Sequence, residues 1–175
     1  MNRVIGLLGN AGAGKTTAAN HLVARYKYVR RPFARPLKQM LLAVGLSQEH
    51  TDGALKNEPC DLLCGTTPRH ALQTLGTDWG RDMISPDLWV TLWLADATRT
   101  PMPVVADDVR FQNEADAIRS LGGIVVKIDR PSVGRTSDHA SETEMDTIRC
   151  DRLVRNLGDL DDLCASLMEV VQHVG

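Results

Sequence analysis

A glycine-rich segment near the N-terminus constrains the fold of this chain more than any other feature. Residues 9–17 read GNAGAGKTT and match the pattern G-x-x-x-x-G-K-[ST], with its fixed positions at Gly9, Gly14, Lys15 and Thr16. An apolar run over residues 3–8 indicates a buried strand, and apolar residues recur at helical spacing over residues 18–26. Because a strand, a glycine-rich turn and a helix follow one another, the sequence predicts a phosphate-binding loop.

The residue types of this loop suit the binding of phosphate. Glycines allow the backbone to curl so that successive N–H groups point inward, and the helix N-terminus adds a partial positive charge. Lys15 is placed to reach the β- and γ-phosphates of a nucleotide, and the Thr16 hydroxyl is placed to ligate Mg²⁺. The alternative interpretation is a glycine-rich turn that carries an incidental lysine.

A second signal lies in residues 103–110, which read PVVADDVR. An apolar strand that ends in acidic residues is where proteins with such a loop place the carboxylate that holds Mg²⁺, directly or through water. Ligands bind at the carboxyl ends of the strands in a parallel sheet, which is where Asp107 and Asp108 stand. We assign Asp107 to the metal and Asp108 or Arg110 to the acceptor side, and the choice between the two acids stays open.

The order of the other elements indicates an α/β fold. Alternating strands and helices predict one three-layer domain over residues 1–175, with a parallel sheet of about five strands. A polar loop at residues 130–143, which contains Arg130 and His139, is expected to close over the phosphates as a lid. The other expected elements are strands at residues 28–33, 123–129 and 150–155, a helix at 113–121, and a last helix from Asp159 with Leu160, Leu163, Leu167 and Val171 on its apolar face.

A helical insertion is predicted at residues 34–100. Pro36 suits the first turn of one helix, and Thr67-Pro68 and Ser85-Pro86 each place a capping hydroxyl before a proline that suits a helix start. The pattern fades between residues 45 and 67, and an irregular stretch of this length is usually functional or mobile. The helix after Pro68 is expected to have one apolar face, made of Leu72, Leu75, Trp79 and Met83.

Composition excludes several classes of protein. The chain has 20 Lys and Arg against 22 Asp and Glu, a net charge of −2, whereas a general nucleic-acid binder is more often strongly basic. No apolar run is long enough to span a bilayer, and the N-terminus has no signal-peptide pattern. The four cysteines match no zinc spacing and are expected to be reduced thiols. We therefore expect a cytoplasmic protein with neither a membrane nor a nucleic acid as its partner.

Four further segments give a specific resemblance. They are FARPLK (33–38), TPRHALQTLGTDWGRDMISPDLWV (67–90), DDVRFQNEADAI (107–118) and DHASE (138–142). Together with the phosphate-binding loop, or P-loop, they resemble the deoxynucleoside monophosphate kinases of tailed bacteriophages. The resemblance implies an adenylate-kinase-like P-loop fold, phosphoryl transfer from ATP with Mg²⁺ to a deoxynucleotide, and the host cytoplasm as the location. The chain departs from the expected pattern at Arg35, in place of an acid, and at Gln112, in place of a proline.

The resemblance also implies roles for individual residues. Lys15, Arg110 and Arg130 would be catalytic, with the two arginines on the transferring phosphoryl group, and Thr16 and Asp107 would hold Mg²⁺. The last strand is more polar than expected, with Asp151, Arg152 and Arg155, which weakens an assignment of the adenine site near Asn156. The ATP phosphates would contact Asn10, Ala11, Gly12, Ala13, Gly14, Lys15, Thr16 and Thr17. The acceptor nucleotide would contact Lys38, Arg69, Gln73, Trp79, Asp108 and Arg110.

Two other functions stay open. One is a kinase for another small phosphorylated acceptor, such as dephospho-coenzyme A or phosphomevalonate. The other is a non-catalytic nucleotide-binding regulatory protein, whose second pocket would be vacant; Arg69, Gln73, Arg110 and Arg130 argue against a vacant pocket. The sequence contains no N-K-x-D string, which a GTPase needs for guanine. It does not predict the accepted base, the selectivity for deoxyribose, or whether the protein is a homodimer.

Overall fold

The computed structural model describes residues 4–132 and 144–172. The chain divides into two compact units. The first unit consists of the described residues of Met1–Phe33 and Trp93–Gly175, and the second unit is Ala34–Leu92. The second unit covers most of the predicted insertion at residues 34–100. Residues 133–143 of the predicted lid-like loop, with His139, lie outside the described residues.

Within the described residues, the first unit contains one sheet of five parallel strands in the order β2-β3-β1-β4-β5. Ile5 of β1 pairs with Val105 of β3 on one side and with Ile124 of β4 on the other. The central strands β1 and β3 are buried at every residue, as expected for a parallel sheet that helices cover on both faces. The strands are β1 (Val4–Leu8), β2 (Val29–Arg30), β3 (Val104–Ala106), β4 (Ile124–Asp129) and β5 (Arg152–Arg155).

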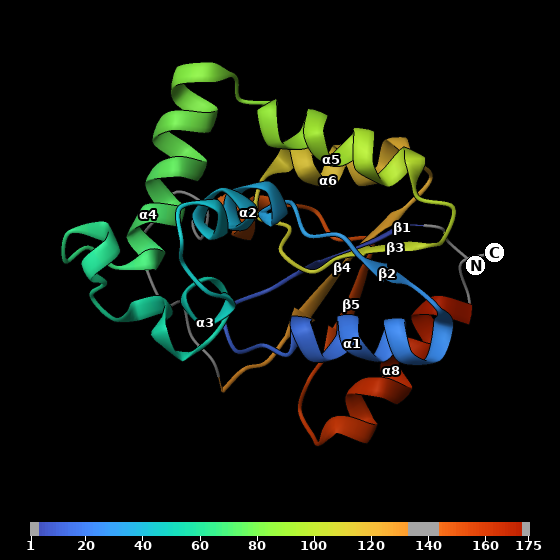
Figure 1. Ribbon diagram of the computed structural model, residues 1–175. Helices are drawn as coiled ribbons and strands as arrows, with labels where there is room; N and C mark the ends of the chain where they lie inside the picture. Colours follow the sequence, from blue (N-terminus) through green and yellow to red (C-terminus); the bar gives the residue numbers. More distant parts are fainter. Residues whose placement is uncertain (1–3, 133–143, 173–175) are drawn as a thin grey trace. The chain divides into compact units, whose positions relative to one another are not determined.

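Helices cover both faces of this sheet. Figure 1 shows α1 (Lys15–Tyr26) and α8 (Leu160–Gln172) on one face and α6 (Gln112–Ser120) on the other. Leu22 of α1 and Leu163 and Leu167 of α8 belong to the buried core against the strands. The predicted three-layer α/β fold with a parallel sheet of about five strands is therefore confirmed.

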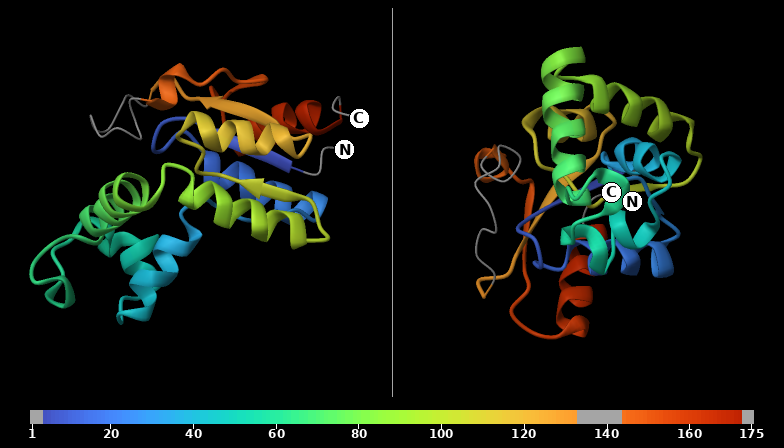
Figure 2. Two further views of the ribbon diagram at one scale, coloured as in Figure 1. Left: turned by 90° about the horizontal axis from the view of Figure 1, so that it is seen from above. Right: turned by 60° about the vertical axis from the view of Figure 1, so that its left-hand side comes forward.

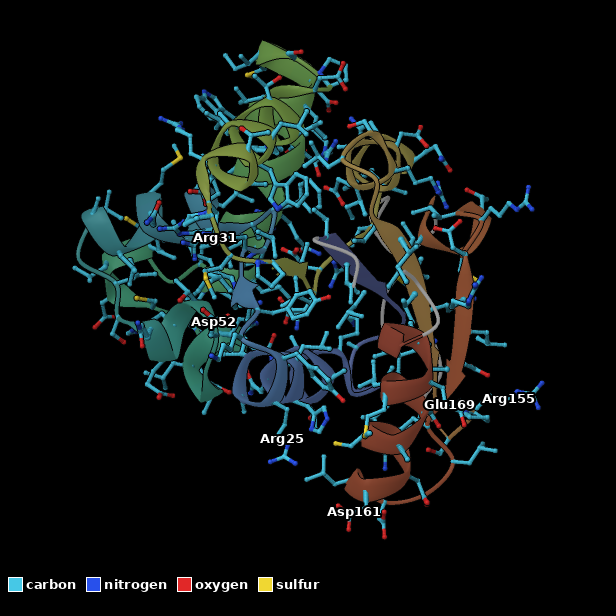
Figure 3. All side chains as sticks on the ribbon, turned by 90° about the vertical axis from the view of Figure 1, so that its right-hand side faces the viewer. Arg25, Arg31, Asp52, Arg155, Asp161 and Glu169 are labelled. Carbon is cyan, nitrogen blue, oxygen red and sulfur yellow. The ribbon has the colours of Figure 1, made fainter. Side chains whose placement is uncertain are left out.

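The last strand is polar because it lies at the edge of the sheet. Val154 is the buried residue of β5, and its neighbours Arg152, Leu153 and Arg155 are exposed. Figure 3 shows Arg155 pointing away from the sheet. Such side chains are common on an edge strand because they face water and discourage pairing with another chain.

The second unit is helical. It contains the beginning of α5 (Leu88–Arg99), and its α4 packs against α2, α3 and η1. Figure 2 shows the course of these elements. The stretch at residues 45–67 is built from three short helical elements rather than from an open loop. The elements are α2 (Arg35–Ala43), α3 (Gln48–Thr51), η1 (Ala54–Asn57), η2 (Asp61–Leu63), α4 (Pro68–Thr74) and η3 (Leu75–Ile84).

The segment after α4 differs from the predicted α-helix. It continues as the π-helix η3, whose hydrogen bonds run from residue i to i+5, so the spacing of an α-helix does not describe its faces. The predicted apolar face is wrong at Met83, which is 75% exposed. Trp89 instead packs against η3, where its indole Nε1 donates to the Gly76 carbonyl at 2.7 Å. A Cβ at Gly80 would overlap the Trp89 ring, so the absence of a side chain there allows the close approach.

Three smaller expectations also differ from the structure. The strand expected at residues 28–33 forms only over Val29–Arg30, at an edge of the sheet. The helix expected from Pro86 begins at Leu88, because Ser85 accepts hydrogen bonds from the backbone N–H groups of residues 87 and 88 and closes a turn. Leu160, expected on the apolar face of α8, is exposed at the first residue of that helix.

Two expectations concern the whole chain. The four cysteines are free thiols. Among residues 4–132 and 144–172, no helix is long and apolar enough to cross a membrane.

Candidate active site

The glycine-rich loop joins β1 to α1 and requires glycine at specific positions. Gly9 has φ of 144° and Gly14 has φ of 104°, values that residues with a side chain rarely adopt. A Cβ at Gly9 would also overlap the carbonyl oxygen of Ile128 in β4. Gly14 is the last residue before α1, so the loop ends where the positive end of that helix begins.

Lys15 lies over this loop. Its Nζ donates hydrogen bonds to the carbonyl oxygens of Gly9 at 2.6 Å and Asn10 at 2.8 Å. The Ala13 N–H donates to the Asn10 carbonyl at 3.1 Å, which closes a turn inside the loop. The ammonium group is therefore held at the loop, where its charge would attract an anion.

Asp107 follows β3 and is 3% exposed. Arg30, at the end of β2, contacts both of its carboxylate oxygens: Nε lies 2.8 Å from Oδ1 and Nη2 lies 2.7 Å from Oδ2. The Thr16 hydroxyl donates to Oδ2 at 3.2 Å. The parallel pairing of β2 with β3 brings Arg30 to Asp107, so the buried charge is compensated by a bidentate partner.

The residues near Asp107 fit a Mg²⁺ ion. Mg²⁺ prefers hard oxygen ligands and usually takes one or two carboxylates together with waters and substrate phosphates. The Thr16 hydroxyl and the Asp107 carboxylate offer oxygen atoms of this kind and lie within hydrogen-bond distance of each other. In the described residues, no group of three or more His, Cys, Asp or Glu side chains is placed to hold a metal ion. A metal here would depend on phosphates and water for its remaining ligands.

The two neighbouring acids have different surroundings. Asp108 Oδ1 accepts a hydrogen bond from the Phe33 N–H at 2.9 Å, whereas Asp107 faces Thr16 and Arg30. Next to them, the buried Glu114 caps α6 by accepting from the N–H groups of Arg110 at 2.8 Å and Phe111 at 3.2 Å. The backbone that carries Arg110 is thus fixed by a carboxylate one helical turn further along the chain.

A cavity of about 440 Å³ opens beside the P-loop. Asn156 is buried there, and its Nδ2 donates to the Ala13 carbonyl at 2.9 Å. Arg130 is exposed, with Nη1 3.5 Å from the Gly12 carbonyl. The cavity therefore has the P-loop on one side and the start of α8 on the other. It is lined by Gly12, Gly14, Lys15, Thr16, Thr17, Arg130, Asn156, Gly158, Asp159, Leu160 and Leu163.

The other predicted acceptor residues belong to the second unit. Lys38 of α2 forms an ion pair with Asp52, and Arg69 of α4 donates from Nε to Asn57 Oδ1 at 2.6 Å. Gln73 also lies in α4, and Trp79 lies in η3 with 39% of its surface exposed.

Sequence reasoning missed two residues of the first unit. Arg30 compensates Asp107, but it stands in a short strand with no motif around it. Asn156 reaches the P-loop from the end of β5, a contact that the sequence analysis does not predict. A weak signal existed in its position directly after a predicted strand, since ligands gather at the carboxyl ends of parallel strands.

Comparison with known structures supports the fold. The chain is similar to shikimate kinase from Aquifex aeolicus, with a TM-score of 0.52 and 14% identity over 97% of this chain and 96% of that one. It is also similar to shikimate kinase from Acinetobacter baumannii in complex with shikimate, with a TM-score of 0.50 and 15% identity over 97% and 92% of the two chains. At these identities the likeness concerns the fold alone.

Comparison with known sequences is more specific. The family model described as deoxynucleotide monophosphate kinase matches residues 64–167. A protein of Acanthamoeba polyphaga mimivirus, named as a candidate deoxynucleotide monophosphate kinase, is 38% identical over 97% of this chain and 96% of its own length. The match includes the P-loop and both units. The chain therefore belongs to the deoxynucleotide monophosphate kinase family.

Proposed function

We propose that this protein transfers the γ-phosphoryl group of ATP to a deoxynucleoside monophosphate, which yields ADP and the deoxynucleoside diphosphate. An oxygen of the acceptor phosphate forms a bond to the γ-phosphorus, and the bond from that phosphorus to the β,γ-bridging oxygen breaks. The observation that carries the proposal is the group of Lys15, Thr16 and Asp107 at the P-loop of a chain of this family.

The donor nucleotide is assigned to the cavity beside the P-loop. Its phosphates would lie against residues 10–17, and its nucleoside would extend between Asn156 and the first turn of α8. Lys15 supplies a positive charge for the β- and γ-phosphates. Mg²⁺ bound near Thr16 and Asp107 would neutralise phosphate charge and orient the phosphates for in-line transfer.

The acceptor needs positive charge more than it needs a base. A phosphate monoester has a second pKa near 6, so it is mostly a dianion at neutral pH and is already a nucleophile. The difficulty is the repulsion between two polyanions, which arginines and lysines reduce. We assign Arg110 and Arg130 to the transferring phosphoryl group, and no histidine to proton transfer. Acceptor binding is assigned to Lys38, Arg69, Gln73, Trp79 and Asp108.

The test is ADP formation from ATP and Mg²⁺ with each deoxy- and ribonucleoside monophosphate in turn, beside a tube without acceptor. We expect turnover with one or a few deoxynucleotides and little without acceptor. Equal ADP release in every tube, or none in any, would contradict the proposal. Dephospho-coenzyme A and phosphomevalonate would then be tested as acceptors.

Lys15→Ala tests the donor side. Removing a charge that acts on the transition state should lower kcat by about 10²–10³-fold. Arg25→Ala is the matched control, because it removes a positive charge from the same helix at a side chain that points away from the protein (Figure 3). Circular dichroism should show that both variants are folded. Near-normal turnover by Lys15→Ala, or an equal loss in the control, would count against the assignment.

A further inference from the structure

The second unit holds its two predicted acceptor cations in different ways. The Lys38 ammonium group is paired with the carboxylate of Asp52. The Arg69 guanidinium group is held by the neutral amide of Asn57, with Nε donating to Oδ1 at 2.6 Å. Asp52 and Asn57 both come from residues 45–67, the stretch whose sequence shows no periodicity. This stretch therefore provides a partner for each cation.

Asp52 is fixed at the end of α3. Its N–H donates to the Gln48 carbonyl at 2.8 Å, and its Oδ2 accepts a hydrogen bond from the buried Thr51 hydroxyl at 3.1 Å. Burial opposes the charge, but hydrogen bonds from Lys38 and Thr51 and the positive charges of Lys38 and Lys56 outweigh it and hold the pKa of Asp52 below its usual value. The carboxylate is therefore charged at neutral pH and compensates Lys38.

Asn57 leaves the charge of Arg69 uncompensated. An amide oxygen carries no net charge, and it uses only the Nε–H of the guanidinium group. Among the residues that the structure describes, Asn57 is the only hydrogen-bond partner of the Arg69 side chain. The four N–H groups on Nη1 and Nη2 keep the fork geometry that binds two oxygens of a phosphate.

We propose that Asp52 is a resident anion that the acceptor phosphate displaces from Lys38, and that Asn57 is a positioning residue that orients Arg69 without neutralising it. This inference rests on the proposed function, since it takes both cations as ligands of the acceptor phosphate. Binding then exchanges one anion for another at Lys38 but adds a new ion pair at Arg69. Asp52 weakens the retention of phosphate, whereas Asn57 strengthens it.

Asp52→Asn tests the first part. The amide can still accept a hydrogen bond from Lys38, but the competing negative charge is gone. We expect the KM for the preferred deoxynucleoside monophosphate to fall about two- to fivefold, the effect of one screened ion pair, with the KM for ATP unchanged. Asp61→Asn is the matched control, because Asp61 is an exposed acid of the same stretch with no ion pair recorded in the described residues. An unchanged or raised KM in Asp52→Asn, or an equal fall in the control, would overturn this part.

Two variants of Asn57 test the second part. Asn57→Ala removes the hydrogen bond and should raise the acceptor KM about five- to tenfold, with kcat and the KM for ATP unchanged. Asn57→Asp keeps an oxygen that can accept from Arg69 but adds a charge that neutralises it, so it should raise the acceptor KM at least as much. An Asn57→Asp variant with the wild-type KM would show that orientation alone matters and would refute the role of the neutral amide.

Calorimetric titration of each protein with the four deoxynucleoside monophosphates separates this inference from the proposed function. If the wild type turns over a deoxynucleotide but Asp52→Asn and Asn57→Ala bind it as the wild type does, only the inference fails. If the wild type neither binds nor phosphorylates any of the four, both fail.

Discussion

Arg30→Met tests whether Arg30 compensates the buried charge of Asp107. The variant keeps much of the aliphatic volume but removes both contacts to the carboxylate, at 2.8 and 2.7 Å. Removing one partner of a fully buried ion pair costs about 3–5 kcal/mol. The Arg30 side chain is 34% exposed, and the Thr16 hydroxyl still donates to Asp107, so water and one hydrogen bond reduce the loss. We expect a loss of about 2–3 kcal/mol in the free energy of unfolding.

The assay is urea and thermal unfolding without nucleotide or Mg²⁺, followed by far-ultraviolet circular dichroism. For a chain of this length, a loss of about 2–3 kcal/mol lowers Tm by about 5–10 °C. Arg31→Met is the matched control. Arg31 is the next residue, and its Nε lies 3.0 Å from an Asp96 carboxylate oxygen, but the Asp96 side chain is 42% exposed. Breaking this ion pair should therefore lower the free energy of unfolding by less than about 1 kcal/mol.

The double variant Arg30→Met/Asp107→Asn separates the buried charge from the packing of Arg30. If the cost comes from an uncompensated carboxylate, Asp107→Asn in the Arg30→Met background should restore stability, so the two changes are far from additive. A loss in Arg30→Met no larger than in Arg31→Met, or a double variant whose loss equals the sum of the single losses, would refute the reasoning.

Two further predictions concern the second unit. Gly80→Ala should lower the free energy of unfolding by about 1–3 kcal/mol, because the added Cβ would overlap the Trp89 ring. Urea unfolding followed by tryptophan fluorescence measures this loss. An unchanged unfolding midpoint would contradict the packing of Trp89 against η3. The lowered pKa of Asp52 adds stability above its unfolded pKa, and this stability is lost as pH falls through the lower folded pKa. Because Asp52 is half exposed, its ion pair with Lys38 contributes at most about 1 kcal/mol to stability. The stability difference between the wild type and Asp52→Asn should therefore shrink from pH 7 to pH 3. A difference that stays constant over this range would contradict the role of the charged carboxylate.

The parts of the fold that could be predicted are those with local signals. The P-loop pattern is contained in nine consecutive residues, and its strand and helix adjoin it directly. Asp107 after β3 could be predicted for the same reason, because an apolar run that ends in acidic residues is also a local pattern. Parallel pairing of β1 with β3 then brings Asp107 to Thr16, a strand order that the sequence analysis does not predict.

The second unit was harder to predict because the sequences of its helices show little hydrophobic periodicity. A π-helix such as η3 has no simple apolar stripe, and the 3.6-residue period placed Met83 in the core although it is exposed. The short elements between residues 45 and 67 contain three or four residues each, too few to show a period. They are held instead by contacts between distant residues, such as the ion pair of Lys38 with Asp52, which lie 14 residues apart in the sequence.

The residues that sequence reasoning missed at the P-loop belong to strands that end at the same edge of the sheet. Arg30 and Asp107 are 77 residues apart, and Asn156 and Ala13 are 143 residues apart, so no local pattern joins them. In both cases the strand order brings them together, because β2 lies beside β3, and β4 and β5 follow β1 on its other side. A parallel sheet collects the polar residues that follow its strands along one edge, and a buried carboxylate there requires a cation from a neighbouring strand. Asp107 is such a carboxylate, and Arg30 at the end of the adjacent strand compensates its charge.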